Sequence, residues 1–285
     1  MPLLFYWRHD NYVEDLGNGA SYHLNSKRDV LHDVERGDSV WAITYCPDGR
    51  YALAAELVVH SRTRNAPGYQ YGPYRVWGDV DSSRYFELDA QPDQEPVIRS
   101  LSVKTDADQL YHSFMGPGSV RRLTAADHRM LVEAAQDIPT EPDAELLPEE
   151  ALERALYQED RDAVAGLVRE ATHGLSSERQ RTIIRTVPER NRALVERLHQ
   201  MYDGRCQICR WDPKDEYGKP LCEGHHIQWL SRGGDDALDN LMLVCPNHHR
   251  AIHQCDAPLD WADLAYDFGA HREGVELDWH LAAGK

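Results

Sequence analysis

Cysteine and histidine side chains that could bind metal ions are concentrated in the C-terminal third of the sequence. In chain order they are Cys206, Cys209, His225, His226, Cys245, His248, His249 and His253. Thiolates and imidazoles are the ligands that zinc and neighbouring transition metals prefer in proteins. The sequence therefore predicts metal chemistry in this segment, and the spacing of the residues divides them into two sites.

The first site is built from two pairs with the same spacing. Cys206 and Cys209 are separated by two residues, and Cys245 with His248 repeats this spacing with a nitrogen ligand. Such pairs can bind one tetrahedral zinc ion, and a complete Cys3His set leaves no position for a substrate. We therefore expect a structural zinc ion that stabilises the fold of this segment. A redox-active dithiol, which is the alternative, does not explain the second pair.

The second site uses the remaining histidines. His249 and His253 are four residues apart, so on a helix that begins near Pro246 both side chains project from the same face. His225 and His226 lie in a strand-like run, where adjacent side chains point to opposite faces. Phosphodiester hydrolysis needs a base that takes a proton from water and a cation beside the phosphate. Histidines are suited to both tasks.

Together with Asn240, this pattern resembles the HNH (ββα-metal) endonuclease family. The resemblance implies that His225, His249 and His253 bind a catalytic divalent metal ion, for which Mg2+, Mn2+, Ni2+, Co2+ and Zn2+ are all candidates. His226 would be the general base that activates water, and Asn240 would hold the loop that carries this base. The alternative is a zinc-binding module that binds DNA without cutting it.

Residues 1–125 differ from the rest of the chain, because short β-branched and aromatic runs alternate with Gly, Pro and Asp turn residues. This pattern predicts a small β-barrel or sandwich. The order of the runs resembles the PUA-like superfamily, and EVE domains in particular, whose relatives read modified bases. A flipped base needs stacking faces and hydrogen-bonding groups. The residues expected to form such a pocket are Trp7, Tyr22, Asn25, Trp41 and Trp77. The alternative is that these side chains form the core of the barrel.

The expected fold class is α+β, with a PUA-like β-barrel, a helical linker and a ββα-metal nuclease domain. The barrel would occupy residues 1–125 and sense modified bases. An acidic linker with helices would follow over 126–185, then the HNH domain over 186–260 and a C-terminal tail over 261–285.

Helix signals occur on both sides of the expected linker. Thr124 and Asp127 predict a capping box that opens a helix. Pro148 is typical of a helix start, and Leu152 with Leu156 continues with helical apolar spacing.

The formal net charge of −17 argues against indiscriminate binding to nucleic acid. Acidic residues are concentrated between 133 and 162, whereas arginine dominates between 179 and 197. These arginines could follow a phosphate backbone. Pairing of Arg192 with Glu196 at helical spacing fits a solvated helix face equally well.

These observations lead us to expect a modification-dependent endonuclease that cuts double-stranded DNA near a modified cytosine, as in defence against phages. A homodimer would allow both strands to be cut. No signal peptide or transmembrane run is found in the sequence, so a cytoplasmic location is expected. The alternatives are an HNH nuclease that acts on unmodified DNA or RNA and a non-catalytic zinc-knuckle protein that binds DNA.

Overall fold

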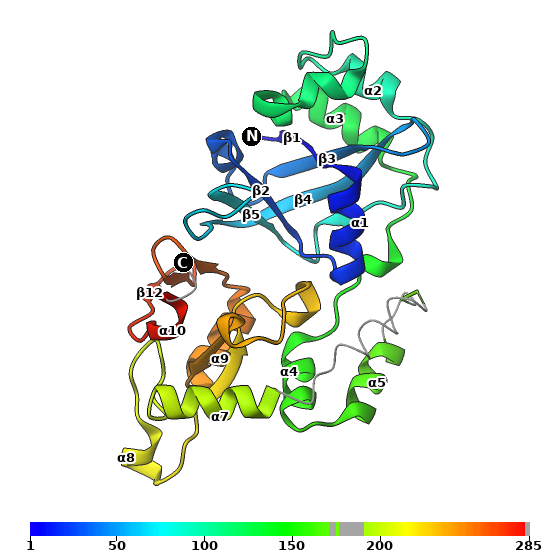
Figure 1. Cartoon of the computed structure of the whole chain (residues 1–285). Helices are drawn as coiled ribbons and strands as arrows, with labels where there is room; N and C mark the ends of the chain where they lie inside the picture. Colours follow the sequence, from blue (N-terminus) through cyan, green and yellow to red (C-terminus); the bar gives the residue numbers. More distant parts are fainter. Residues whose placement is uncertain (171–174, 177–190, 283–285) are drawn as a thin grey trace. The chain divides into compact units, whose positions relative to one another are not determined.

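The computed structural model describes residues 1–170, 175–176 and 191–282 (Figure 1). The chain divides into two compact units, of which the first comprises residues 1–17 and 22–144 and the second 18–21 and 145–285. Each unit combines helices with a β-sheet, so the expected α+β class is confirmed. The arginine-rich stretch between 179 and 190 lies outside the described residues.

The first unit is built on a seven-stranded sheet in the order β2-β5-β4-β3-β1-β7, with β6 beside β4. Its strands are β1 (Leu3–Tyr6), β2 (His23–Ser26), β3 (Ser39–Tyr45), β4 (Tyr51–Arg64), β5 (Tyr74–Gly78), β6 (Arg84–Tyr85) and β7 (Val120–Arg122). The long strand β4 pairs with β3, β5 and β6 and therefore joins the two halves of the sheet. Among the described strands no ladder joins β2 to β7, so hydrogen bonds do not close this sheet into a barrel.

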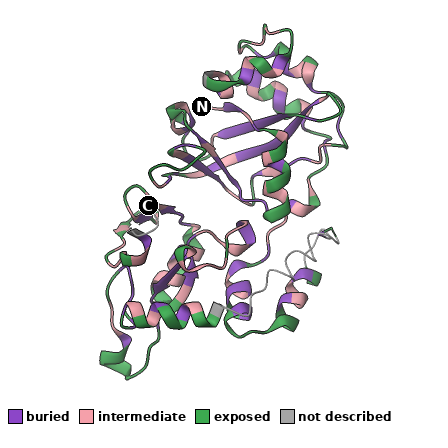
Figure 2. Cartoon of the chain, viewed as in Figure 1, coloured by how far each residue is buried: buried purple, intermediate pink, exposed green. Residues whose placement is uncertain are grey.

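The helices of the N-terminal part are short, and several cover the sheet. They are α1 (His9–Asn18), η1 (Asp29–Asp33), α2 (Glu95–Ser100), η2 (Leu110–Phe114), η3 (Gly116–Ser119), α3 (Ala125–Ala134) and η4 (Pro142–Ala144). The capping box predicted at the start of α3 is present, because Thr124 and Asp127 each accept a hydrogen bond from the other's backbone N–H. Burial of strands β3 and β4 along most of their length is visible in Figure 2.

Residues 126–144, which the sequence places in a linker, belong to the core of the first unit. Leu131, Ala135 and Ile138 are buried in one apolar cluster with Trp41 and Ile43 of strand β3. The difference has a simple cause: the apolar face of α3 is covered by the sheet, and local acidity does not reveal such packing.

The second unit contains a ββα arrangement in which strands β8 (Glu223–His226) and β9 (Leu241–Val244) form an antiparallel pair followed by helix α9 (Pro246–Cys255). Its other helices are α4 (Glu149–Tyr157), α5 (Arg161–Glu170), α7 (Asn191–Met201), α8 (Pro213–Tyr217), η5 (Leu230–Arg232), η6 (Leu238–Asn240) and α10 (Trp279–Ala282). Strand β9 is buried over its whole length at the centre of the apolar core.

The segment expected to be a C-terminal tail is also folded. Strands β10 (Leu259–Asp260), β11 (Ala265–Asp267) and β12 (Arg272–Gly274) form a small antiparallel sheet. Tyr266 and Leu281 lie in the same core cluster as strand β9, so this segment is part of the second unit. None of the described helices is long and apolar enough to cross a membrane.

Candidate metal centre and nuclease site

Helix α9 brings two of the predicted metal ligands together. Pro246 occupies the first turn, where its missing N–H leaves no hydrogen bond unmade. His249 and His253 then lie on one face, with their Nε2 atoms 3.0 Å apart. The Nδ1 atom of His249 lies 2.6 Å from the carboxylate of Glu223, which holds the ring so that Nε2 faces His253.

His225 completes this cluster from strand β8. Its ring centre is 5.3 Å from that of His249 and 4.9 Å from that of His253. The side chain is fully buried, and neither ring nitrogen has a hydrogen-bond partner within the described part of the chain. Burial keeps the pKa of His225 well below its ordinary value, so the imidazole is neutral. A buried neutral imidazole with unpaired nitrogens is suited to bind a divalent cation.

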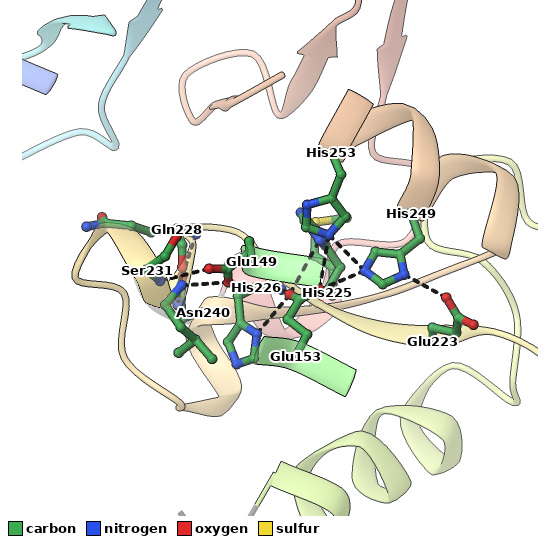
Figure 3. A network of polar contacts seen from close by, with 12 residues as sticks. Glu149, Glu153, Glu223, His225, His226, Gln228, Ser231, Asn240, His249 and His253 are labelled. Carbon is green, nitrogen blue, oxygen red and sulfur yellow. Dashed lines mark hydrogen bonds and ion pairs between the residues drawn. The ribbon is translucent and has the colours of Figure 1, made fainter. Parts of the chain in front are cut away.

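Glu153 of helix α4 lies in the middle of the histidines, and the sequence analysis did not single it out. Its Oε2 atom is 2.8 Å from Nε2 of His249 and 3.0 Å from Nε2 of His253. Its Oε1 atom accepts the backbone N–H of His226 at 2.8 Å (Figure 3). Burial would raise the pKa of this carboxyl, but hydrogen bonds from the surrounding histidines outweigh burial and hold the pKa well below its ordinary value. Glu153 is therefore an ionised carboxylate inside the unit.

A signal for this residue does exist in the sequence. Glu149 and Glu153 occupy the same helix face as the apolar Leu152 and Leu156, and all four are buried. Two acidic residues on the apolar face of an amphipathic helix indicate that the helix packs against polar partners.

His226, the predicted general base, is held between two carboxylates. Its Nδ1 atom is 3.0 Å from Glu153 Oε1, and its Nε2 atom is 3.0 Å from Asp236 Oδ1. Burial disfavours the charged imidazolium, but the hydrogen bonds to Asp236 and Glu153 outweigh burial and raise the pKa to about 9. In this conformation both ring nitrogens carry protons at neutral pH. One of the two contacts must open, and the freed ring nitrogen must lose its proton, before His226 can accept a proton from water.

The loop between strands β8 and β9 is fastened by two side chains. Asn240 accepts the backbone N–H of Gln228 at 2.8 Å and donates to the backbone oxygens of Gln228 and Asp235 at 2.9 and 2.7 Å. Glu149 of helix α4 accepts the backbone N–H groups of Leu230 and Ser231 at 2.7 and 2.8 Å (Figure 3). These contacts position the segment that follows His226.

The four residues predicted to bind zinc also come together. The ligand atoms of Cys206, Cys209, Cys245 and His248 all lie within 4.8 Å of one another. His248 Nδ1 is 3.1 Å from Cys245 Sγ, while its Nε2 atom is 2.9 Å from Glu273 and so fixes the ring. A hydrogen bond from Cys206, helped by His248, lowers the pKa of Cys245 and favours its thiolate. This donor set fits a tetrahedral zinc ion.

A cavity of about 420 Å³ borders the histidine cluster. Glu153, His226 and His249 contribute to its wall, and Arg154 and Arg250 lie along it as well. The guanidinium groups are of the type that binds phosphate oxygens. The cavity therefore provides room beside the candidate metal ligands, and its wall carries both basic and acidic side chains.

The residues expected to form a base pocket in the first unit do not form one cluster. Trp41 is fully buried and donates its indole N–H to His128 Nδ1 at 2.9 Å. The rings of Trp7 and Tyr22 both pack against Tyr85, with centre distances of 5.9 and 5.1 Å. These three candidates thus contribute to the packing of the interior.

Asn25 and Trp77 form a separate group around the buried Arg75. The Oδ1 atom of Asn25 accepts a hydrogen bond from Arg75 Nε at 2.8 Å, and the guanidinium lies 5.1 Å from the ring centre of Trp77. The indole N–H of Trp77 donates to Thr63 at 2.8 Å. This pair thus lies beside a charged side chain, and both Trp77 and Arg75 are buried.

Comparisons with known proteins match part of the C-terminal unit to a family. Residues 206–254 match the HNH endonuclease family. Over 49 residues the chain is 39% identical to the Type IV methyl-directed restriction enzyme EcoKMcrA of Escherichia coli (strain K12), a stretch that covers 17% of this chain and 18% of that protein.

Among solved structures, the Type IV phosphorothioation-dependent restriction endonuclease ScoMcrA is 14% identical, with 80% of this chain and 46% of that chain covered. The TM-score is 0.20, which is too low to indicate a shared fold. The C-terminal unit thus contains an HNH endonuclease domain, and over that domain the chain is similar to an McrA restriction enzyme.

Proposed function

We propose that this protein is a metal-dependent restriction endonuclease that hydrolyses phosphodiester bonds of double-stranded DNA near a modified cytosine. The observation that carries the nuclease part is the buried, unpaired His225 beside His249 and His253, within a segment that matches HNH endonucleases. Imidazoles directed at one point are a donor set for a divalent cation. Such a cation would neutralise the charge that develops on the scissile phosphate and on the departing oxygen.

The chain's own residues supply the remaining chemistry in this proposal. His226 takes the proton from the attacking water after one of its contacts to Glu153 or Asp236 opens and the freed ring nitrogen has released its own proton to solvent. Asn240 holds the loop that carries this base. The Cys3His cluster around Cys206 holds a structural zinc ion, because a site with four protein ligands has no position left for a substrate.

The choice of a modified cytosine rests on the relative and on the expected fold of the first unit. The relative over the HNH segment is described as methyl-directed, and the first unit is proposed to be a PUA-like, EVE-like reader with a pocket near Asn25 and Trp77. Action as a homodimer in the cytoplasm belongs to the same proposal, since each HNH site cuts one strand. An HNH nuclease for unmodified DNA or RNA and a non-cutting DNA-binding protein are the competing functions.

The decisive experiment is digestion of matched duplexes that contain cytosine, 5-methylcytosine or 5-hydroxymethylcytosine, with Mg2+, Mn2+, Co2+, Ni2+ or Zn2+ added in turn. Metal-dependent cutting of the modified duplexes alone is the expected result. Equal cutting of all three would contradict the modified-base part, and cutting of a matched RNA would favour the RNA alternative. If no metal supports nicking of any substrate, the nuclease proposal fails. His249→Ala serves as the control that separates this activity from contaminating nucleases.

A further inference from the structure

We infer that Glu153 is a fourth protein ligand of the metal ion bound by His225, His249 and His253, so that helix α4 is part of the nuclease centre. This inference rests on the proposed metal site and deepens it. Glu153 lies outside the segment 206–254 that matches HNH endonucleases, so the match does not assign it.

The distances between donor atoms support coordination. The Oε2 atom of Glu153 and the Nε2 atoms of His249 and His253 form a triangle with edges of 2.8, 3.0 and 3.0 Å. Neighbouring ligand atoms about 2.1 Å from a six-coordinate ion are about 3.0 Å apart, so the triangle matches one face of such a coordination shell. One ligand atom from each of the four residues lies within 4.8 Å of the others.

The burial and the negative charge of Glu153 also support coordination. Glu153 is only 5% exposed, and a carboxylate is costly to bury unless cations or hydrogen-bond donors face it. His225 faces the same carboxylate at 3.7 Å, beyond hydrogen-bonding distance, and its nitrogens have no partner among the described residues. A cation between these two groups would be coordinated by the lone pair of His225, and the same cation would compensate the negative charge of Glu153.

The two oxygens of Glu153 also have separate surroundings. Oε2 faces His249 and His253, whereas Oε1 accepts the backbone N–H of His226. One carboxylate can therefore bind the ion through Oε2 and still fix the strand that carries the candidate base. With four protein ligands, a tetrahedral ion would be saturated, and a six-coordinate ion would keep positions for a phosphate oxygen and water.

The first test is Mn2+ binding to the full-length protein, measured by calorimetry on Glu153→Gln and on the wild type. Glu150→Gln is the matched control, since this side chain lies on the same helix, is 42% exposed and pairs with Arg154. Loss of a ligand should weaken Mn2+ binding at least about tenfold, the lower bound known for residues that merely support ligands. The control should bind as the wild type does, and zinc content reports on intact folding.

Equal or tighter Mn2+ binding by Glu153→Gln would overturn the inference, because the carboxylate would then only occupy the position that the ion needs. If the wild type and His249→Ala bind Mn2+ alike, the proposed metal site itself is absent. That outcome is distinct from a wild-type site that does not depend on Glu153.

A second measurement needs no variant. Anomalous diffraction from crystals of the Mn2+-loaded wild-type protein should place the ion within about 2.2 Å of a Glu153 oxygen. An ion bound by the histidines alone, with the carboxylate moved away, would overturn the inference.

Discussion

His226 contacts a carboxylate through each ring nitrogen and is almost fully buried. A glutamine at this position keeps a polar side chain between Glu153 and Asp236 but cannot accept a proton from water. We therefore expect His226→Gln to lower the cleavage rate at least about 100-fold, the usual contribution of a general base. Plasmid nicking under single-turnover conditions measures this effect.

The matched control for this variant is His112→Ala, which removes an exposed histidine of the first unit. Zinc content and circular dichroism should be the same for both variants and the wild type. Near-wild-type cleavage by His226→Gln would remove His226 from the role of base while leaving the metal site in place.

At the scale of elements, helix α9 begins at the Cys3His cluster, which Cys206 joins from outside the helix, and it ends at Cys255. Cys206→Ser removes a buried ligand, and we expect loss of about one zinc ion per chain together with a lower melting temperature, because a closed site stabilises the fold. Metal analysis and thermal unfolding measure the two effects.

Cys255→Ser changes an exposed thiol at the C-terminal end of α9 and should retain zinc and stability. A wild-type protein that is purified without zinc and melts as Cys206→Ser does would show that the four residues have no structural metal.

The capping box of α3 makes stability depend on pH. Burial would raise the pKa of Asp127, but hydrogen bonds from Ser102 and Thr124 outweigh burial and lower it to about 2 from an ordinary value of 3.8. Because the folded-state pKa is the lower one, the stabilisation is complete above the ordinary value and is lost as the pH falls toward 2. Its size is about 2 kcal/mol.

Asp127→Asn should therefore be less stable than the wild type by about this amount near pH 7, and the difference should shrink below about pH 3. Urea unfolding followed by tryptophan fluorescence at both pH values gives the comparison. The exposed Asp137 provides a control, since Asp137→Asn should change stability little at either pH. A constant difference between Asp127→Asn and the wild type would contradict the assignment.

At the scale of the whole molecule, the net charge of −17 limits attraction to phosphates. Discrimination of a modified base must then come from stacking and hydrogen bonds, which salt screens little. With the His226→Gln protein, we expect affinity for all duplexes to fall between about 50 and 200 mM salt, while the ratio between modified and unmodified DNA stays nearly constant. Fluorescence anisotropy with matched duplexes measures both quantities.

Trp77→Phe should lower this ratio more than it lowers overall affinity, because it replaces the indole that faces the Arg75 guanidinium and removes the N–H that donates to Thr63. Trp41→Phe is the comparison, since that side chain is fully buried and lies in a different cluster. Equal binding to modified and plain duplexes at every salt concentration would remove the sensor proposal and leave the nuclease proposal standing.

Local spacing in the sequence was sufficient to separate two sets of candidate metal ligands. Cys206, Cys209, Cys245 and His248 follow a repeated two-residue spacing, and the structure brings them to one point. The i,i+4 histidines of α9 and the α3 capping box were equally predictable, because both depend on the geometry of a single helix.

Only the tertiary structure shows which residues from distant parts of the sequence contact one another. Glu153 precedes His226 by 73 positions and meets the histidines because its helix packs beside them, a fact that no local pattern contains. The segment near Tyr266 and the helix near Leu131 look like tail and linker by composition, yet each is buried against a sheet or a strand. Trp41 and Trp77 are equally compatible with a core and with a pocket, since aromatic side chains suit both, and only packing separates them into different groups.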